Sequence, residues 1–156
     1  MMNEWFECKV RYEKTLENGL VKKVTEPYLV DALSFTEAER RFIEEIEPFM
    51  SGDFQVTDIK RAKYAELFET DEEAADKWFK AKVAFITLDE KSGAEKKSNQ
   101  NMLIQASDLR DAVRRLDKGM EGTMADYEIA SIAETPIMDV FHYKADIPEA
   151  PEFPEA

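Results

Sequence analysis

WFECKV occupies residues 5–10 and WFKAKV occupies residues 78–83, and four of the six positions are identical. The two segments hold both tryptophans of a 156-residue chain. In each segment apolar side chains alternate with polar or charged ones, which is the pattern of a β-strand with one buried face. The face predicted to be buried carries Phe6, Cys8, Val10, Phe79, Ala81 and Val83.

Two longer matches extend this similarity. YLVDALSFTEAERRF (28–42) aligns with MLIQASDLRDAVRRL (102–116), and DFQVTDI (53–59) aligns with DYEIASI (126–132). The offset stays at 73 or 74 residues in all the matches. A constant offset predicts a tandem duplication of one unit, which we expect to fold with pseudo-twofold symmetry.

Each unit is expected to contain two strands, a helix and a third strand. LENG (16–19) and EKSGAE (90–95) resemble turns, so the first strand of each unit should form a hairpin with the next. Ser34 and Glu37 form a capping box, after which apolar residues recur every four positions, as in an amphipathic helix. The predicted fold class is α+β, a tandem β-β-α-β duplication with the helices on one side of the sheets.

The expected boundaries follow from composition. The first unit should span residues 1–65 and the second residues 78–144, joined by the acidic linker ELFETDEEAADK (66–77), in which Thr70 could cap a short helix. The end of the chain, ADIPEAPEFPEA (145–156), alternates prolines with acids. It is expected to be a disordered acidic tail, because it lacks the apolar content to pack.

The net charge of −13 argues against a protein that coats duplex DNA through bulk electrostatics. Ten of these negative charges lie between Glu66 and Asp76 or after Lys144, which leaves about −3 for the rest of the chain. A locally positive surface is therefore compatible with the composition. The start of the chain lacks the features of a signal peptide and no segment is apolar enough to span a membrane, so we expect a cytoplasmic protein.

Catalytic and metal-binding signatures are missing from the sequence. His142 is the only histidine and Cys8 the only cysteine, so neither a disulfide within the chain nor a thiolate cluster can form. No P-loop, nucleophile elbow or dinucleotide-binding motif occurs. We interpret Cys8 as a small buried residue and His142 as a structural or surface residue, and we expect no enzymatic activity, no cofactor and no metal.

The unburied side of the first strands offers a candidate binding surface. It combines aromatic and basic side chains, and basic residues after the third strand of the first unit could join them. This combination suits single-stranded nucleic acid, because aromatic rings stack on bases and cations follow the phosphates. The predicted binding residues are Trp5, Lys9, Arg11, Lys60, Arg61, Lys63, Trp78, Lys80 and Lys82.

Other interpretations of the same residues stay open. Trp5 and Trp78 could fill a seam between the units or a homodimer contact, and the lysines could be charges that keep strand edges from aggregating. The chain could instead be an acidic interaction module that presents residues 66–77 and the tail to a host protein as a mimic of nucleic-acid phosphates.

The opening WFECKVRYEKT, the segment YLVDALSFTEAERRF and the two-unit layout resemble a family of small proteins of unknown function from Bacteroides-group bacteria and their phages. The resemblance extends to about Lys144, and the first forty residues carry most of it. It implies a phage or mobile-element origin. It implies no activity and no functional residues, so the site expectations rest on the residues alone.

Overall fold

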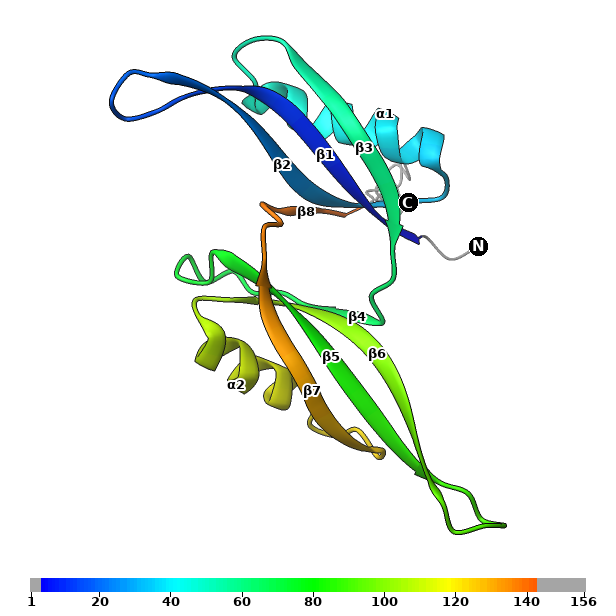
Figure 1. Ribbon diagram of the computed structural model, residues 1–156. Coiled ribbons are helices and arrows are strands. Elements are labelled where there is room, and N and C mark those ends of the chain that lie inside the picture. Colours follow the sequence, from blue (N-terminus) through cyan, green and yellow to red (C-terminus); the bar gives the residue numbers. More distant parts are fainter. Residues whose placement is uncertain (1–3, 143–156) are drawn as a thin grey trace, which may run out of the picture.

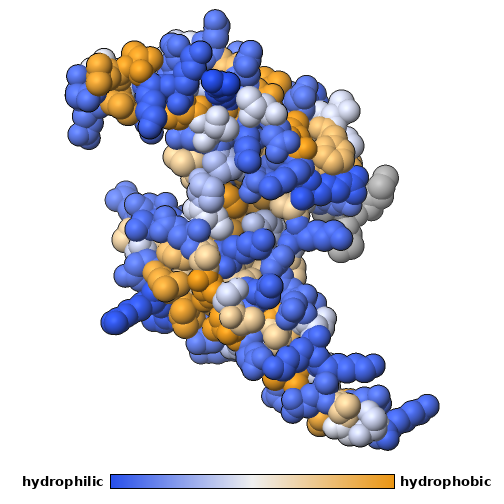
Figure 2. All heavy atoms as spheres, in the orientation of Figure 1, coloured by the Kyte–Doolittle hydropathy of each residue, from blue (hydrophilic) through white to orange (hydrophobic). Residues whose placement is uncertain are grey.

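The computed structural model describes residues 4–142 and has a mixed α+β fold, with two α-helices and two four-stranded sheets in this range (Figure 1). In chain order the elements are β1 (Glu4–Thr15), β2 (Val21–Ala32), α1 (Phe35–Ile46), the 3-10 helix η1 (Glu47–Phe49), β3 (Phe54–Ala62), β4 (Glu66–Phe68), β5 (Lys77–Leu88), β6 (Glu95–Ala106), α2 (Leu109–Gly119), β7 (Asp126–Thr135) and β8 (Val140–Phe141). The sheet orders are β3-β1-β2-β8 and β4-β6-β5-β7. In Figure 2 the two units form lobes that meet at a narrower junction.

Both predicted hairpins are confirmed. β1 and β2 pair antiparallel over their whole length, and β5 and β6 do the same. Gly19 and Gly93 in the two turns have φ angles of 83° and 69°, which glycine adopts without the clash that a Cβ atom would cause. Because each of these strands has twelve residues, the hairpins extend beyond the helices as two arms (Figure 1).

The helices cover one face of each sheet, as expected. The Ser34 hydroxyl accepts a hydrogen bond from the Glu37 amide at 3.2 Å, and the Asp108 carboxylate caps α2 through the Asp111 amide at 2.8 Å. The residues predicted for the buried strand faces lie in the two cores beneath the helices. Burial, and then the charge of Glu7, raise the pKa of Cys8 to about 12, so its thiol stays protonated and packs as a small apolar group.

The third strands, β3 and β7, form open edges of the two sheets. Each pairs antiparallel with the first strand of its unit, and each ladder has one irregularity, after Lys9 in the first sheet and after Lys82 in the second. The shifts leave Thr57 and Ala130 without a partner on the neighbouring strand. Such bulges twist an edge strand and discourage pairing with another chain.

The segment 66–77 is not simply a linker, and the expected helix after Thr70 is wrong. Glu66–Phe68 forms β4, which pairs parallel with β6, and no residue between 69 and 76 is helical. The Thr70 hydroxyl accepts a hydrogen bond from the Glu72 amide at 3.3 Å, which closes a turn instead. The apolar side chain of Phe68 explains the strand, because it packs against the second core.

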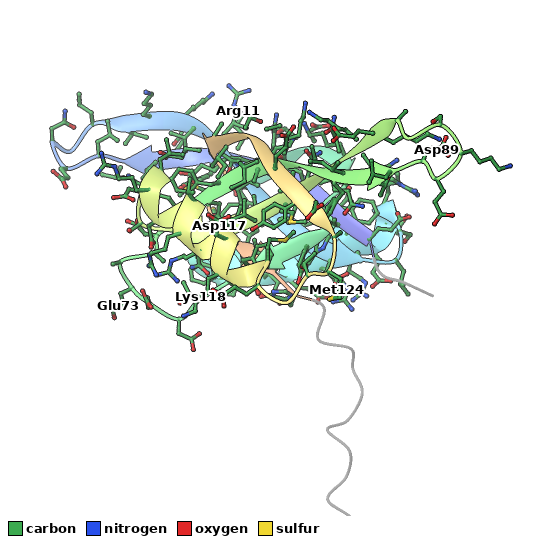
Figure 3. The ribbon with its side chains drawn as sticks, turned by 90° about the horizontal axis from the view of Figure 1, so that it is seen from below. Arg11, Glu73, Asp89, Asp117, Lys118 and Met124 are labelled. Atoms are coloured by element: carbon green, nitrogen blue, oxygen red, sulfur yellow. The ribbon has the colours of Figure 1, made fainter. Side chains whose placement is uncertain are left out.

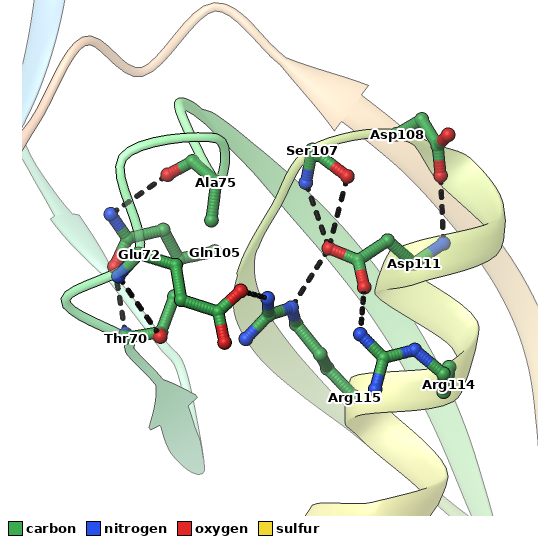
Figure 4. A network of polar contacts seen from close by, with 9 residues as sticks. All are labelled: Thr70, Glu72, Ala75, Gln105, Ser107, Asp108, Asp111, Arg114 and Arg115. Carbon is green, nitrogen blue, oxygen red and sulfur yellow. Dashed lines mark hydrogen bonds and ion pairs between the residues drawn. The ribbon is translucent and has the colours of Figure 1, made fainter.

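Polar contacts fasten residues 69–76 to the second unit (Figure 4). The Gln105 side-chain oxygen accepts from the Thr70 amide and its nitrogen donates to the Ala75 carbonyl, both at 3.0 Å. Arg115 bonds Glu72 and also donates to Asp111 at 2.8 Å. A hydrogen bond from the Ser107 amide, followed by the one from Arg115, holds the pKa of Asp111 well below its usual range. This segment is therefore part of the second unit.

The end of the described chain returns to the first sheet. Val140 pairs with Leu29 and Phe141 with Val30, so that β8 runs parallel to β2. The Phe141 ring stacks on Tyr28 with centroids 5.5 Å apart. β4 pairs parallel with β6 in the same way, but it comes from the start of its own unit. β8 therefore adds an edge strand next to β2 in the first sheet, as β4 adds one next to β6 in the second sheet.

A third apolar cluster forms a seam between the units. Its buried members are Leu29, Trp78, Leu103 and Ile137, and the partly buried residues around it are Trp5, Ala62, Tyr64, Leu67 and Val140.

Neither α-helix within residues 4–142 is long and apolar enough to cross a membrane. The tail predicted at residues 145–156 lies outside the described residues.

Truncation of the chain tests whether β8 stabilises the first sheet. A chain that ends at Thr135 loses Ile137, which is 5 % exposed, together with β8, so its free energy of unfolding should fall by about 2 kcal/mol or more. A chain that ends at Lys144 is the control and should melt like the full-length protein. Equal melting temperatures for all three chains would show that β8 does not stabilise the first unit.

Gly119 tests the docking of β4. A Cβ atom at this position would lie 2.5 Å from the Phe68 ring, so Gly119→Ala should destabilise the protein by roughly 1–3 kcal/mol in urea unfolding. Gly52→Ala is the matched control, because a Cβ atom there meets nothing within 4 Å, and its effect should stay within about 1 kcal/mol. If the two variants are equally stable, Phe68 does not pack on α2.

Candidate functional site

The two tryptophans lie in different surroundings. Trp78 is only 3 % exposed and belongs to the seam, which supports the seam interpretation for this residue and leaves no exposed ring for stacking. Trp5 is half-buried and meets His142 edge-on, with ring centroids 5.3 Å apart. The His142 imidazole lies 2.7 Å from the Glu69 carboxylate, and its side chain is half exposed.

In the first sheet, the basic residues of the predicted site mostly have acidic neighbours. Lys60 lies 3.2 Å from Glu7, and Arg61 lies 3.1 Å from Glu4. The Arg61 guanidinium also lies over the Phe35 ring, 5.2 Å from its centroid. Lys9 stands opposite Asp58 in the β1–β3 ladder, whereas Arg11 and Lys63 are exposed and form no ion pair within residues 4–142.

The second sheet presents its cations differently. Lys80 and Lys82 are exposed on the side of β5 that faces away from α2, and neither forms an ion pair or hydrogen bond in the described part of the chain. Their cross-strand neighbours are uncharged: Leu103 and Ala133 beside Lys80, Asn101 and Ser131 beside Lys82. By sequence Lys80 aligns with Glu7, so the two sheet faces differ in charge although their strands pair alike.

A cleft of about 510 Å³ lies where the units meet. It is bounded by the start of β1, the connection from β3 to β4, and the middle of β6. Its lining residues are Glu4, Trp5, Arg61, Ala62, Lys63, Tyr64, Ala65, Asn99, Gln100 and Asn101. The cleft therefore brings together three of the predicted binding residues, Trp5, Arg61 and Lys63.

The cleft adjoins the lysines of β5. Asn101 pairs with Lys82 in the β5–β6 ladder, and directly opposed side chains in such a ladder lie about 5 Å apart. Lys63 in the cleft forms no ion pair within residues 4–142, and Arg61 is already paired with Glu4. A bound anion would therefore meet Lys63 and Lys82 as cations that no carboxylate of the described chain neutralises.

Tyr64 adds a second ring to the cleft. Burial, and then the charge of Glu7, raise the pKa of the Tyr64 phenol, so at neutral pH its hydroxyl keeps its proton and can donate a hydrogen bond. Sequence reasoning missed Tyr64, although it directly follows the predicted residue Lys63. It also missed Asn99, Gln100 and Asn101, although three consecutive amides before an apolar run were a readable signal.

Arg11 projects from one side of the molecule, whereas Glu73 and Lys118 lie toward the opposite side (Figure 3). Glu73, which belongs to the acidic segment 66–77, is therefore separated from Arg11 of the first sheet. Within residues 4–142 no polar or charged residue is buried, and no three His, Cys, Asp or Glu side chains gather as metal ligands would.

The fold and the cleft describe an α+β protein of two similar units with an aromatic and basic cleft at their junction. The chain belongs to the family described as Domain of unknown function (DUF4494), whose model matches residues 4–143 and hence both sheets. The resemblance to a family of unknown function is thereby confirmed, while the source in particular bacteria and phages stays a prediction. No curated protein matches the chain.

Truncating the tryptophans tests the seam. Trp78→Ala should cost on the order of 3–5 kcal/mol in urea unfolding, because it removes a buried ring from the only apolar cluster described between the units. Trp5→Ala should cost less, since that ring is only half-buried. An unfolding midpoint of Trp78→Ala equal to that of the unmodified protein would contradict the seam assignment.

Proposed function

We propose that this protein is a non-enzymatic single-stranded nucleic-acid-binding protein, acting in replication or a related process, that holds the strand in the cleft between its units and along the lysines of β5. One observation carries this proposal: the cleft places the Trp5 and Tyr64 rings and Lys63 from the first unit beside amide side chains of the second. Lys82 stands next to that wall, so a base in the cleft could keep its phosphates near cations.

The chemistry of single strands fits these groups. Unpaired bases expose their faces, and stacking on a protein ring contributes roughly 1–3 kcal/mol per base. Trp5 and Tyr64 are both half-buried, so their rings are held in place while part of each is accessible. With Trp78 in the seam, we restrict stacking to these two rings and assign Lys80 and Lys82 to the phosphates. Arg11 and Lys9 could extend the path onto the first sheet.

The acidity of the chain does not oppose this function. Charges further apart than a Debye length, about 8 Å at physiological salt, are largely screened in water. Residues 69–76 are fastened to β6 and α2, and the charge of Glu72 is neutralised in part by Arg115. The local charge at the cleft therefore decides binding more than the total of −13.

We also infer that the two units arose by duplication of one β-β-α-β unit and are related by a pseudo-twofold axis. The aligned segments, the common order of elements, the capped helices and the bulges at Thr57 and Ala130 support this inference. The opposite charges at Glu7 and Lys80 then mark the divergence that made the exposed face of β5 more basic than that of β1.

A titration with oligo-dT tests the proposed function. Binding should quench the fluorescence of Trp5, and Trp78→Phe should keep that quenching. The affinity of the Lys80→Gln/Lys82→Gln variant should depend less on salt. The slope of log affinity against log salt concentration should become less negative by roughly 0.7 for each phosphate that the two lysines neutralise in the unmodified protein. Lys91→Gln/Lys118→Gln removes the same charge outside the cleft and should bind like the unmodified protein.

Absence of binding at low salt would overturn the proposal and favour the acidic interaction module, with a host protein as its partner. Asp71, Glu73 and Asp76 would then be the available carboxylates, because they form no ion pair in the described part of the chain. We rank this function second, because the cleft at the junction of the units lies elsewhere and includes none of these three residues.

A further inference from the structure

Two amide side chains, those of Asn99 and Asn101, stand on one face of β6 at the cleft, while Gln100 between them pairs with Val83 and points to the other face. Asn99, Gln100 and Asn101 belong to β6, and within residues 4–142 none of the three side chains makes a hydrogen bond. An amide carries both a donor and an acceptor, so it can pair with the edge of a nucleobase, which also presents donors beside acceptors. Phosphate contacts with lysine cannot distinguish one base from another.

The strand that carries these amides has an open edge at this point. β4 pairs with β6 only from Met102 to Ile104, and the Ala65 amide donates to the Asn101 carbonyl at 2.8 Å. Before Asn101 no strand among residues 4–142 covers that edge of β6. The Asn99 side chain is exposed and that of Asn101 is half-buried, so a ligand in the cleft can reach both without displacing a described protein group.

The opposite wall supplies the rings. Trp5 and Tyr64 come from the first unit, and the seam fixes them, since both also pack against the cluster that contains Trp78. A volume of about 510 Å³ lies within the range of small-ligand pockets and suits one nucleotide. The cleft thus combines a face for stacking with a wall for hydrogen bonding.

We propose that the cleft takes one unstacked nucleobase of the bound strand and reads its edge through Asn99 and Asn101, so that the protein prefers one base over the others. This inference rests on the proposed function and adds base selectivity to it. Lys80 and Lys82 contact phosphates and so bind every strand alike. The amides form hydrogen bonds only with a base whose edge matches their donors and acceptors.

The test compares homo-oligomers of dA, dC and dT, each of about 12 nucleotides, by fluorescence anisotropy. The affinities should differ by roughly 5- to 150-fold between the best and the worst base. Asn99→Ala/Asn101→Ala should bring the three affinities close together, while Lys80→Gln/Lys82→Gln should lower all three by the same factor. Gln55→Ala removes an exposed amide outside the cleft and should leave the preference intact.

Each other outcome overturns the inference in a distinguishable way. If no oligomer binds, the proposed function fails as well. If the oligomers bind equally, or if the asparagine variant keeps the preference, base reading fails while strand binding stands. Mononucleotides that bind as tightly as the oligomers would show that the cleft takes a free nucleotide instead. Should the alanine variant melt early, Asn99→Ser/Asn101→Ser keeps a polar wall and repeats the comparison.

Discussion

The seam of Leu29, Trp78, Leu103 and Ile137 is the interaction on which the rest of the structure depends. A sheet covered by one helix has a second face and open edges, and a unit of this size is barely stable by itself. The seam covers part of those faces with apolar side chains from both units. It also fixes where β4 and β8 dock, because Leu67 and Val140 pack against it.

The same seam creates the cleft. Because the units touch through one apolar cluster, the side chains at its border stay accessible and come from both halves of the chain. The Trp5 and Tyr64 rings therefore pack against the cluster on one side, and on the other side they line the cleft together with Asn99 and Asn101. A binding site at a junction of this kind needs both units, so loss of the seam would remove the site even if each sheet stayed folded.

Charge distinguishes the exposed faces of the two sheets. Their first strands pair in the same register with their neighbours, yet Glu7 stands where Lys80 stands in the other unit. In the first sheet Glu7 and Glu4 neutralise Lys60 and Arg61. In the second sheet no carboxylate opposes Lys80 or Lys82 in the ladders. The face of the second sheet that carries Lys80 and Lys82 is thus the more basic of the two.

Local patterns in the sequence determined the hairpins, both helices and the buried strand faces. Phe6, Cys8 and Val10 alternate, and Ser34 caps a helix, whatever lies elsewhere in the chain. Only the tertiary structure decided that Trp78 is buried in the seam and that Phe68 and Phe141 pair with strands of distant sequence. It also decided that Trp5 and Asn101 line one cleft. These contacts depend on how two sheets pack, and alternation along one strand shows which face a residue occupies but not what covers that face.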